Sequence, residues 1–174
     1  TPMNAILGMA YLALDTELTD KQYDYIEKIQ LSAKSLLGII NDILDFSKVE
    51  ANKLELESND FNINDLLSTL ANLASSLIEK HNIEVIFDID DNIPEYLIGD
   101  TLRLNQVLLN LLSNAIKFTQ QGEVVVSVKV KERLIDSAYV ILEFSVIDTG
   151  IGIAEEQKSK LFKPFSQLDA SISR

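Results

Sequence analysis

The sequence predicts an α+β fold, in which a helical hairpin precedes a domain of mixed helices and strands. The first third of the 174 residues carries an uninterrupted helical repeat of apolar side chains. The remainder alternates helical and strand-like segments without regular β-α-β spacing, which favours a mixed sheet covered by helices on one face. Charged side chains are also distributed unevenly along the sequence. Residues 1–100 hold 19 acidic and 6 basic side chains, a net charge of −13, whereas residues 101–174 hold 8 and 9, a net charge of +1.

Composition excludes several classes of function. A chain that is 47% hydrophobic and 24% charged can bury a core. It has no cysteine, which excludes disulfides, thiolate zinc sites and cysteine nucleophiles, and its single histidine, His81, is interpreted as a structural residue at a helix end. The net charge of −12 argues against nucleic acid and anionic lipid as partners. No apolar run is long enough to span a membrane, so we expect a soluble chain without membrane contact.

The first two helices form an antiparallel hairpin. Thr19 and Gln22 make a capping-box pattern, which predicts a helix from Thr19 to about Ala51. A shorter helix carries Met3, Leu7, Ala10 and Leu14. On the long helix, apolar residues repeat at spacings of 3 and 4, which is typical of a helical bundle. This seam consists of Ile26, Ile29, Ala33, Leu36, Ile40 and Ile43.

A two-helix hairpin cannot cover that seam together with the flanking Leu37, Leu44 and Phe46. We therefore expect a homodimer in which residues 1–51 of two copies form a four-helix bundle. The alternative is that both helices pack on the rest of the same chain. Residues 52–60 are interpreted as a linker, with a short strand at Leu54 and Leu56, and residues 61–174 as a second domain.

The second domain is expected to contain two helices and three strands. Asn62 or Asn64 caps the first helix, which ends near His81, and Asp100 caps the second, which ends near Phe118. Pro94 and Gly99 interrupt the chain between them. Strands are expected over 83–89, 124–130 and 139–147.

Two patterns in this domain could carry chemistry. Asn110, Asn114 and Lys117 project from one side of the second helix, where amide oxygens can complete the shell of Mg²⁺ and the lysine can attract phosphates. The alternative is a solvent-facing polar stripe. Asp148-Thr149-Gly150-Ile151-Gly152-Ile153 follows an apolar strand, and its carboxylate can accept a hydrogen bond from an exocyclic amine. The alternative there is a tight turn.

These residues, in order, resemble the catalytic core of a sensor histidine kinase of the hybrid type. Asn110 with Leu111 to Thr119 resembles the asparagine box of that family, and Asp148 to Ile153 resembles its first glycine box. Leu161-Phe162-Lys163-Pro164-Phe165 resembles its phenylalanine box. Residues 1–51, with Asn41 to Lys48, resemble its dimerisation and phosphotransfer hairpin.

The resemblance implies a hairpin dimer followed by a Bergerat-type α/β sandwich that binds ATP and Mg²⁺. It implies that Asn114 is the Mg²⁺ ligand and that Asn110 and Lys117 assist with metal or phosphate. Asp148 would bind the adenine amine and Phe118 would contact the adenine. The remaining implied residues are Gly150 and Gly152, which shape the pocket, and Phe162 and Phe165, which anchor a mobile lid.

The implied activity is transfer of the ATP γ-phosphoryl to a histidine and then to an aspartate of a response-regulator receiver domain. In related ATPases the residue at position 110 is a glutamate that activates water, and Asn110 cannot act as that base. The alternatives are a dimeric nucleotide-sensing scaffold or interaction module without catalysis, and a nucleotide-hydrolysing chaperone or topoisomerase-like domain. The resemblance also implies a cytoplasmic location, with the parent protein anchored in the inner membrane.

The sequence departs from the family pattern at both ends. The family motif H-E-x-x-T-P is matched only from Thr1-Pro2, which puts the phosphoacceptor histidine before Thr1, and no second glycine box follows the phenylalanine box. We therefore expect these residues by themselves not to autophosphorylate. Thr1 occupies the position at which the family often orients water for dephosphorylating the regulator. Loss of that activity on Thr1→Ala in the parent protein would support such a role, and unchanged activity would count against it.

Overall fold

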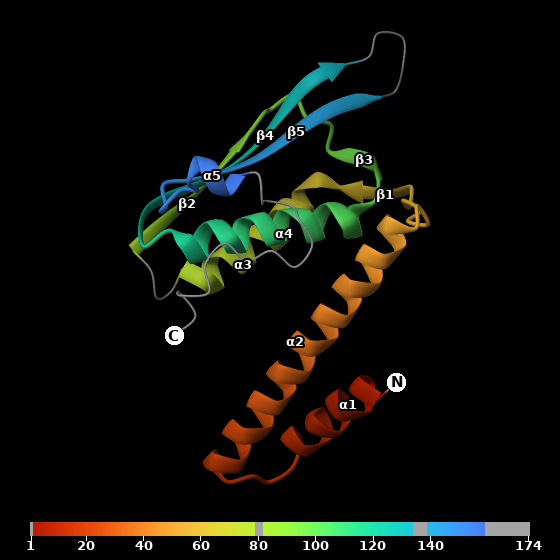
Figure 1. Ribbon diagram of the computed structural model, residues 1–174, viewed down its shortest axis with the longest axis vertical. Coiled ribbons are helices and arrows are strands. Elements are labelled where there is room, and N and C mark those ends of the chain that lie inside the picture. The colour runs from red at the N-terminus through yellow and green to blue at the C-terminus, as the bar shows by residue number, and fades with distance from the viewer. Residues whose placement is uncertain (1, 79–81, 134–138, 159–174) are drawn as a thin grey trace. The chain divides into compact units, whose positions relative to one another are not determined.

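The chain separates into two units, which we call the hairpin unit (residues 1–55) and the sheet unit (residues 56–174). Figure 1 shows the computed structural model, which describes residues 2–78, 82–133 and 139–158. Of the residues singled out in the sequence, Thr1, His81, Phe162 and Phe165 lie outside these ranges. Within them, no helix is long and apolar enough to cross a membrane.

The hairpin unit consists of α1 (Pro2–Leu14) and α2 (Asp20–Glu50). The capping box predicted before α2 is confirmed. The backbone N–H of Thr19 donates to Gln22 Oε1 over 2.9 Å, and the backbone N–H of Gln22 donates to Thr19 Oγ1 over 3.4 Å. Because both residues partner each other's free backbone donors, the start of α2 is fixed locally. At its other end, Ala51 caps the helix and Asn52 takes a positive φ of 51°.

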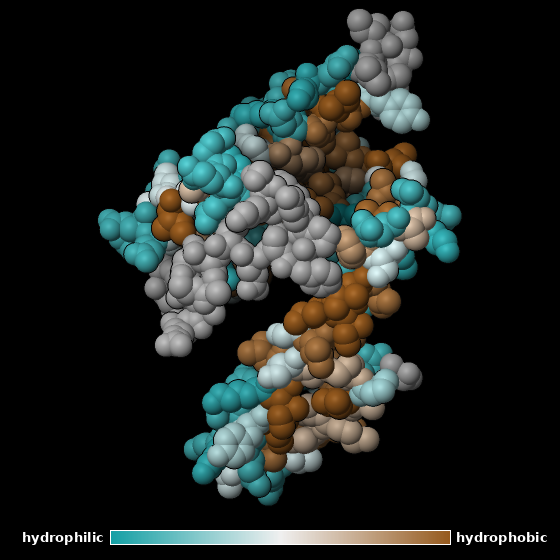
Figure 2. All heavy atoms as spheres, viewed as in Figure 1, coloured by the Kyte–Doolittle hydropathy of each residue, from teal (hydrophilic) through white to brown (hydrophobic). Residues whose placement is uncertain are grey.

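Most of the predicted seam faces solvent in the hairpin unit of a single chain. Ala33 is buried, but the side chains of Ile29, Leu36 and Ile43 are 51%, 48% and 45% exposed. Figure 2 shows hydrophobic side chains gathered along the visible face of this unit. Contacts between α1 and α2 therefore cover only part of the apolar surface that the heptad pattern creates.

The sheet unit contains a mixed three-stranded sheet, as predicted. Its strands are β2 (Asn82–Ile89), β4 (Gln121–Arg133) and β5 (Val140–Asp148), in the order β2-β4-β5. β2 runs parallel to β4, and β4 runs antiparallel to β5. Two helices, α3 (Ile63–Ile78) and α4 (Thr101–Phe118), lie side by side on one face of this sheet (Figure 1). A short helix, α5 (Glu155–Lys158), follows β5.

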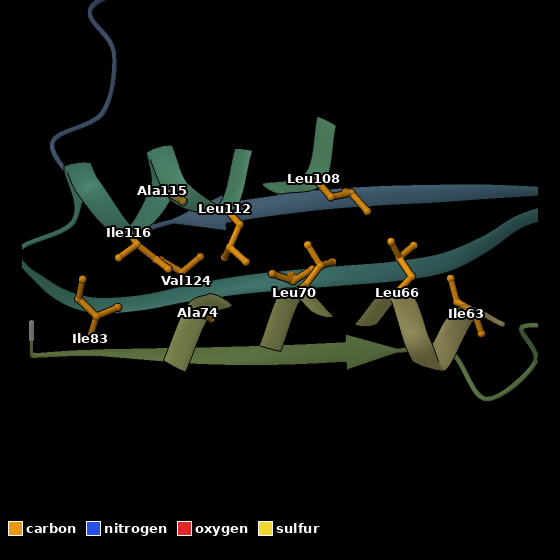
Figure 3. Close-up of a cluster of buried hydrophobic side chains, with 11 residues drawn as sticks. Ile63, Leu66, Leu70, Ala74, Ile83, Leu108, Leu112, Ala115, Ile116 and Val124 are labelled. Atoms are coloured by element: carbon orange, nitrogen blue, oxygen red, sulfur yellow. The ribbon is translucent and has the colours of Figure 1, made fainter. Parts of the chain in front are cut away.

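The core lies between these two helices and the sheet. Val124, Val126 and Val128 alternate along β4 and are at most 1% exposed, which is the period of two that buries one face of a strand. Figure 3 shows side chains of α3 and α4 pointing toward one another and toward Val124. The helix residues of this cluster are Ile63, Leu66, Leu70 and Ala74 on α3, and Leu108, Leu112, Ala115 and Ile116 on α4.

The start of α4 is fixed by Asp100, as the sequence predicts. Its Oδ1 accepts from the backbone N–H of Arg103 over 2.9 Å, and its Oδ2 accepts from the backbone N–H of Glu57 over 3.0 Å. The bond from Arg103, followed by the bond from Glu57, holds the pKa of Asp100 below its ordinary value. One carboxylate thus caps α4 and ties it to the segment that leads into β1.

The predicted strand at Leu54 and Leu56 is wrong. The structure instead pairs β1 (Asn59–Asn62) with β3 (Tyr96–Gly99) as an antiparallel two-stranded sheet, and β3 was not predicted. Four residues are too few to show an alternation with a period of two in the sequence. These strands form because segments that are distant in the sequence pair with each other. Asn62 does cap α3, since its Oδ1 accepts from the backbone N–H of Asn64 over 2.8 Å.

Leu112→Ala is expected to lower the free energy of unfolding of the sheet unit by about 2–5 kcal/mol, because Leu112 is fully buried and its truncation leaves a cavity. Leu102→Ala is the matched control, since Leu102 lies on the same helix and is 69% exposed. Denaturant unfolding followed by circular dichroism measures both changes. Equal losses from the two variants would contradict the assignment of this core.

Candidate functional site

Two of the three predicted polar residues on α4 are hydrogen-bonded to each other. Asn114 Nδ2 donates to Asn110 Oδ1 over 3.3 Å, and both side chains are exposed on the side of α4 away from Leu108 and Leu112. This bond uses the donor group of Asn114 and leaves its Oδ1 available to another partner. An amide oxygen held in this way suits a hard cation such as Mg²⁺.

Lys117 and Phe118 occupy the last turn of α4. The Nζ of Lys117 lies 5.1 Å from the centroid of the Phe118 ring, within the range of a cation–π interaction. Lys117 is exposed and Phe118 is half-buried. The end of α4 therefore presents a positive charge beside an aromatic surface.

The Asp148 to Ile153 segment forms a sharp turn directly after β5. The backbone N–H of Gly150 donates to Asp148 Oδ1 over 2.9 Å. Gly152 has a φ of 66°, a left-handed conformation that a residue with a Cβ rarely adopts. The carboxylate is thus held by its own turn, and its Oδ2 has no hydrogen bond within the part of the chain that the structure describes.

The structure brings this turn against the end of α4. The backbone N–H of Ile151 donates to the carbonyl oxygen of Phe118 over 3.3 Å. A Cβ on Gly150 would lie 2.5 Å from the same oxygen and 2.8 Å from Asp148 Oδ1. The close approach of the two segments therefore requires glycine at this position, and Phe118 of the asparagine box meets Gly150 and Ile151 of the glycine box here.

A second attachment of the turn was missed by the sequence reasoning. Thr149 hydrogen-bonds through both its backbone and its side chain to Glu123, the third residue of β4. The sequence holds one signal of this pairing, the glycine at position 122. Gly122 has a φ of 126°, and a Cβ there would overlap the side chain of Thr149.

A buried polar atom marks the same junction. Thr119, the residue after Phe118, is fully buried, and its Oγ1 has no hydrogen-bond partner among the residues described. Buried hydroxyls normally bond to protein or to an ordered water. Among the described residues, Asp148 Oδ2 and Asn114 Oδ1 accept no hydrogen bond, and Lys117 supplies a cation on the same helix as Asn114. This donor and acceptor set fits an adenine amine, a hard cation and phosphate.

No group of three or more His, Cys, Asp or Glu side chains that could hold a metal occurs within the described ranges. Asn110 and Asn114 carry amides and belong to no such group, so a metal held by Asn114 Oδ1 would complete its coordination shell with water or phosphate oxygens. Mg²⁺ binds in this way when it accompanies a nucleotide.

Comparison with known proteins matches two parts of the chain to family models. Residues 1–52 match the His Kinase A (phospho-acceptor) domain, and residues 99–174 match the family described as histidine kinase-, DNA gyrase B- and HSP90-like ATPase. The chain is 44% identical over its whole length to the signal transduction histidine-protein kinase BarA of Escherichia coli, of which it covers 19%. It is 43% identical to hybrid signal transduction histidine kinase L of Dictyostelium discoideum, of which it covers 10%.

Solved structures decide the family. Full-length ShkA in complex with AMPPNP matches 95% of this chain with a TM-score of 0.73 and 35% identity, and the chain covers 34% of it. The catalytic domain of histidine kinase ThkA matches 63% of this chain with a TM-score of 0.52 and 32% identity, and the chain covers 70% of it. This chain belongs to the histidine kinase family. The predicted hairpin followed by an ATPase-type α/β domain is confirmed.

The roles of the individual site residues in this chain stay predictions. The structure places Asn110, Asn114, Lys117 and Phe118 along α4, and Asp148 in the turn that meets its end. The implied lid anchors, Phe162 and Phe165, and the implied phosphatase residue, Thr1, lie outside the described residues. The chain spans about a fifth of the length of BarA, so the activity of the whole protein is a matter for proposal.

Gly150→Ala is expected to lower the free energy of unfolding by about 1–3 kcal/mol, because the added Cβ cannot fit against the Phe118 carbonyl without moving backbone. Gly99→Ala is the matched control, since its Cβ would meet only Phe61 Cε1 at an ordinary 3.6 Å. The midpoint of thermal unfolding reports both changes. A Gly150→Ala protein as stable as Gly99→Ala would show that the turn does not pack against α4 as described.

Proposed function

We propose that this chain is the core of an ATP-dependent protein histidine kinase of a two-component pathway. Such a kinase transfers the γ-phosphoryl of ATP to a histidine, and the histidine passes it to an aspartate of a receiver domain. The single observation that carries the proposal is the meeting of the Asp148 turn with the end of α4, since it joins the carboxylate of Asp148 to the helix that carries Asn114 and Lys117. ShkA, solved with AMPPNP, supports nucleotide binding at a related site.

Each site residue has a proposed task. Asp148 Oδ2 accepts a hydrogen bond from the adenine amine, and Phe118 contacts the adenine ring. Asn114 Oδ1 holds Mg²⁺, with Asn110 orienting the amide through their 3.3 Å hydrogen bond. Lys117 neutralises phosphate charge. Gly150 and Gly152 shape the turn, and Phe162 and Phe165 are proposed anchors of a lid.

Asn110 favours transfer to a protein nucleophile over hydrolysis. An amide cannot take a proton from water, so this side chain cannot serve as the general base of an ATPase. Phosphoryl transfer in that case depends on positioning and on charge stabilisation. The one histidine of these 174 residues, His81, lies apart from residues 1–52, which match the phosphoacceptor domain. We therefore expect no phosphohistidine on these residues taken alone.

The hairpin unit is proposed to form a homodimer. Its match to the His Kinase A domain and the exposure of Ile29, Leu36 and Ile43 support a four-helix bundle of two copies. A response-regulator receiver domain is the proposed second partner, since ThkA, 28% identical to this chain, was solved in complex with response regulator protein TrrA. We also propose that Thr1 assists dephosphorylation of that regulator, that the core is cytoplasmic, and that the parent protein is membrane-anchored.

Asp148→Asn is expected to weaken ATP binding about tenfold or more, because the amide replaces a charged acceptor and turns a donor toward the adenine amine. Calorimetric titration with ATP and Mg²⁺ measures the change. Asp91→Asn, an exposed aspartate in the turn after β2, is the control and should bind as the unaltered protein does. Light scattering on the same samples reports the dimer.

The outcomes separate the candidate functions. Equal affinity in the Asp148→Asn and Asp91→Asn proteins would contradict the proposed adenine site. A folded, dimeric protein that does not bind ATP would favour an interaction module without catalysis. Steady ATP hydrolysis by the full-length protein without phosphohistidine would favour an ATPase.

A further inference from the structure

Thr149 extends the pairing of β4 and β5 by one residue. Its side chain, and not its backbone carbonyl, then accepts the last hydrogen bond of the ladder. In the ladder, Asp148 pairs with Val124, and the next pair is Thr149 with Glu123. The backbone N–H of Thr149 donates to the carbonyl oxygen of Glu123 over 3.2 Å, as in an ordinary antiparallel pair. The hydrogen bond in the opposite direction, from Glu123 to Thr149, is different. The backbone N–H of Glu123 donates to Thr149 Oγ1 over 3.0 Å, so a side-chain oxygen takes the place of the carbonyl oxygen.

This replacement allows the turn to begin one residue after Asp148. Because Oγ1 satisfies the Glu123 N–H, the carbonyl of Thr149 is not required in the ladder and the chain is free to turn into Gly150. Oγ1 also lies 3.2 Å from the Glu123 carbonyl oxygen, to which it can donate its own proton. Thr149 is therefore joined to Glu123 by three hydrogen bonds.

Gly122 provides the space for this arrangement. A Cβ at Gly122 would overlap Thr149 Oγ1 and would lie 3.4 Å from Thr149 Cβ. Its φ of 126° is also one that residues with a side chain rarely adopt. The Thr149 side chain thus sits over Gly122 while it bonds to the next residue.

The turn is consequently held on two sides. The Thr149 bonds attach it to the start of β4, and the Ile151 N–H attaches it to the Phe118 carbonyl at the end of α4. Asp148 precedes Thr149 directly, and its Oδ1 is already used by the Gly150 N–H. The direction of Oδ2 depends on how firmly this turn is fixed.

We propose that Thr149 is a positioning residue that acts through Asp148 in recognition of the nucleotide's exocyclic amine. The inference rests on the proposed function, because it assumes that Asp148 accepts a hydrogen bond from the adenine. Thr149 itself touches no nucleotide in this proposal. Its hydroxyl fixes the turn so that Asp148 Oδ2 points toward the amine before ATP arrives.

A merely structural role for Thr149 makes a different prediction. If the hydroxyl only stabilised the fold, its removal would weaken binding of every nucleotide to the same degree. If Thr149 acts through Asp148, its removal would weaken binding only of nucleotides that carry the exocyclic amine. Purine riboside triphosphate, which lacks the exocyclic amine of ATP, is therefore the probe that separates the two.

The test compares Thr149→Val with Thr149→Ser in the full-length protein, using calorimetric titration with Mg²⁺ and either nucleotide. Thr149→Val removes the hydroxyl and is expected to weaken ATP binding about five- to tenfold, while binding of purine riboside triphosphate changes less than about twofold. Thr149→Ser keeps the oxygen and should retain the ATP affinity. In an Asp148→Asn background, Thr149→Val should cause no further loss, because the two residues act on one contact. Thermal unfolding confirms that each variant is folded.

Each of the following results would overturn the inference. Equal weakening for both nucleotides would show a structural role, and unchanged ATP affinity in Thr149→Val would show no role. If Asp148→Asn weakens ATP binding while Thr149→Val does not, the proposed function stands and the positioning role fails. If the unaltered protein binds no ATP, the proposed function fails and this inference fails with it.

Discussion

The contact between the carbonyl oxygen of Phe118 and the Gly150–Ile151 backbone is the constraint on which the site depends. It joins the end of α4 to the end of β5 through one hydrogen bond and one position where only glycine fits. Both partners in this contact are backbone groups, so no side chain forms it directly. The buried face of α4, with Leu108 and Leu112, packs α4 against α3 and the sheet and so determines where Phe118 lies.

The same helix therefore packs into the core on one side and carries residues of the candidate site on the other. Residues four apart share a face, so Leu108 and Leu112 point into the core while Asn110 and Asn114 remain exposed. The side chains of a well-packed core have little freedom to move. Because these side chains hold α4 in place, the backbone positions of Asn110 and Asn114 are also restricted. Asp100 adds to this by capping the helix at the opposite end from the site.

The sequence was sufficient wherever a feature depends on neighbours along the chain. The Thr19 capping box, the Asp100 cap and the buried alternation of Val124, Val126 and Val128 are local patterns, and the structure contains all of them. Features that depend on pairing across the chain were not predictable. The β1–β3 pair joins segments about 40 residues apart, and Thr149 meets Glu123 only because β5 aligns with β4 in one register. Periodicity gives the face of a strand but not its partner.

The irregularity in the β4–β5 ladder has a consequence for how the protein can vary. The register shifts between Val130 and Glu132, and regular pairing runs from there to Val124 and Asp148. The connection between the two strands lies on the other side of this bulge from Asp148. Because the bulge separates the pairs of Glu132 and Arg133 from the regular ladder, a change at that end of the two strands need not alter the register that places Asp148 beside Val124.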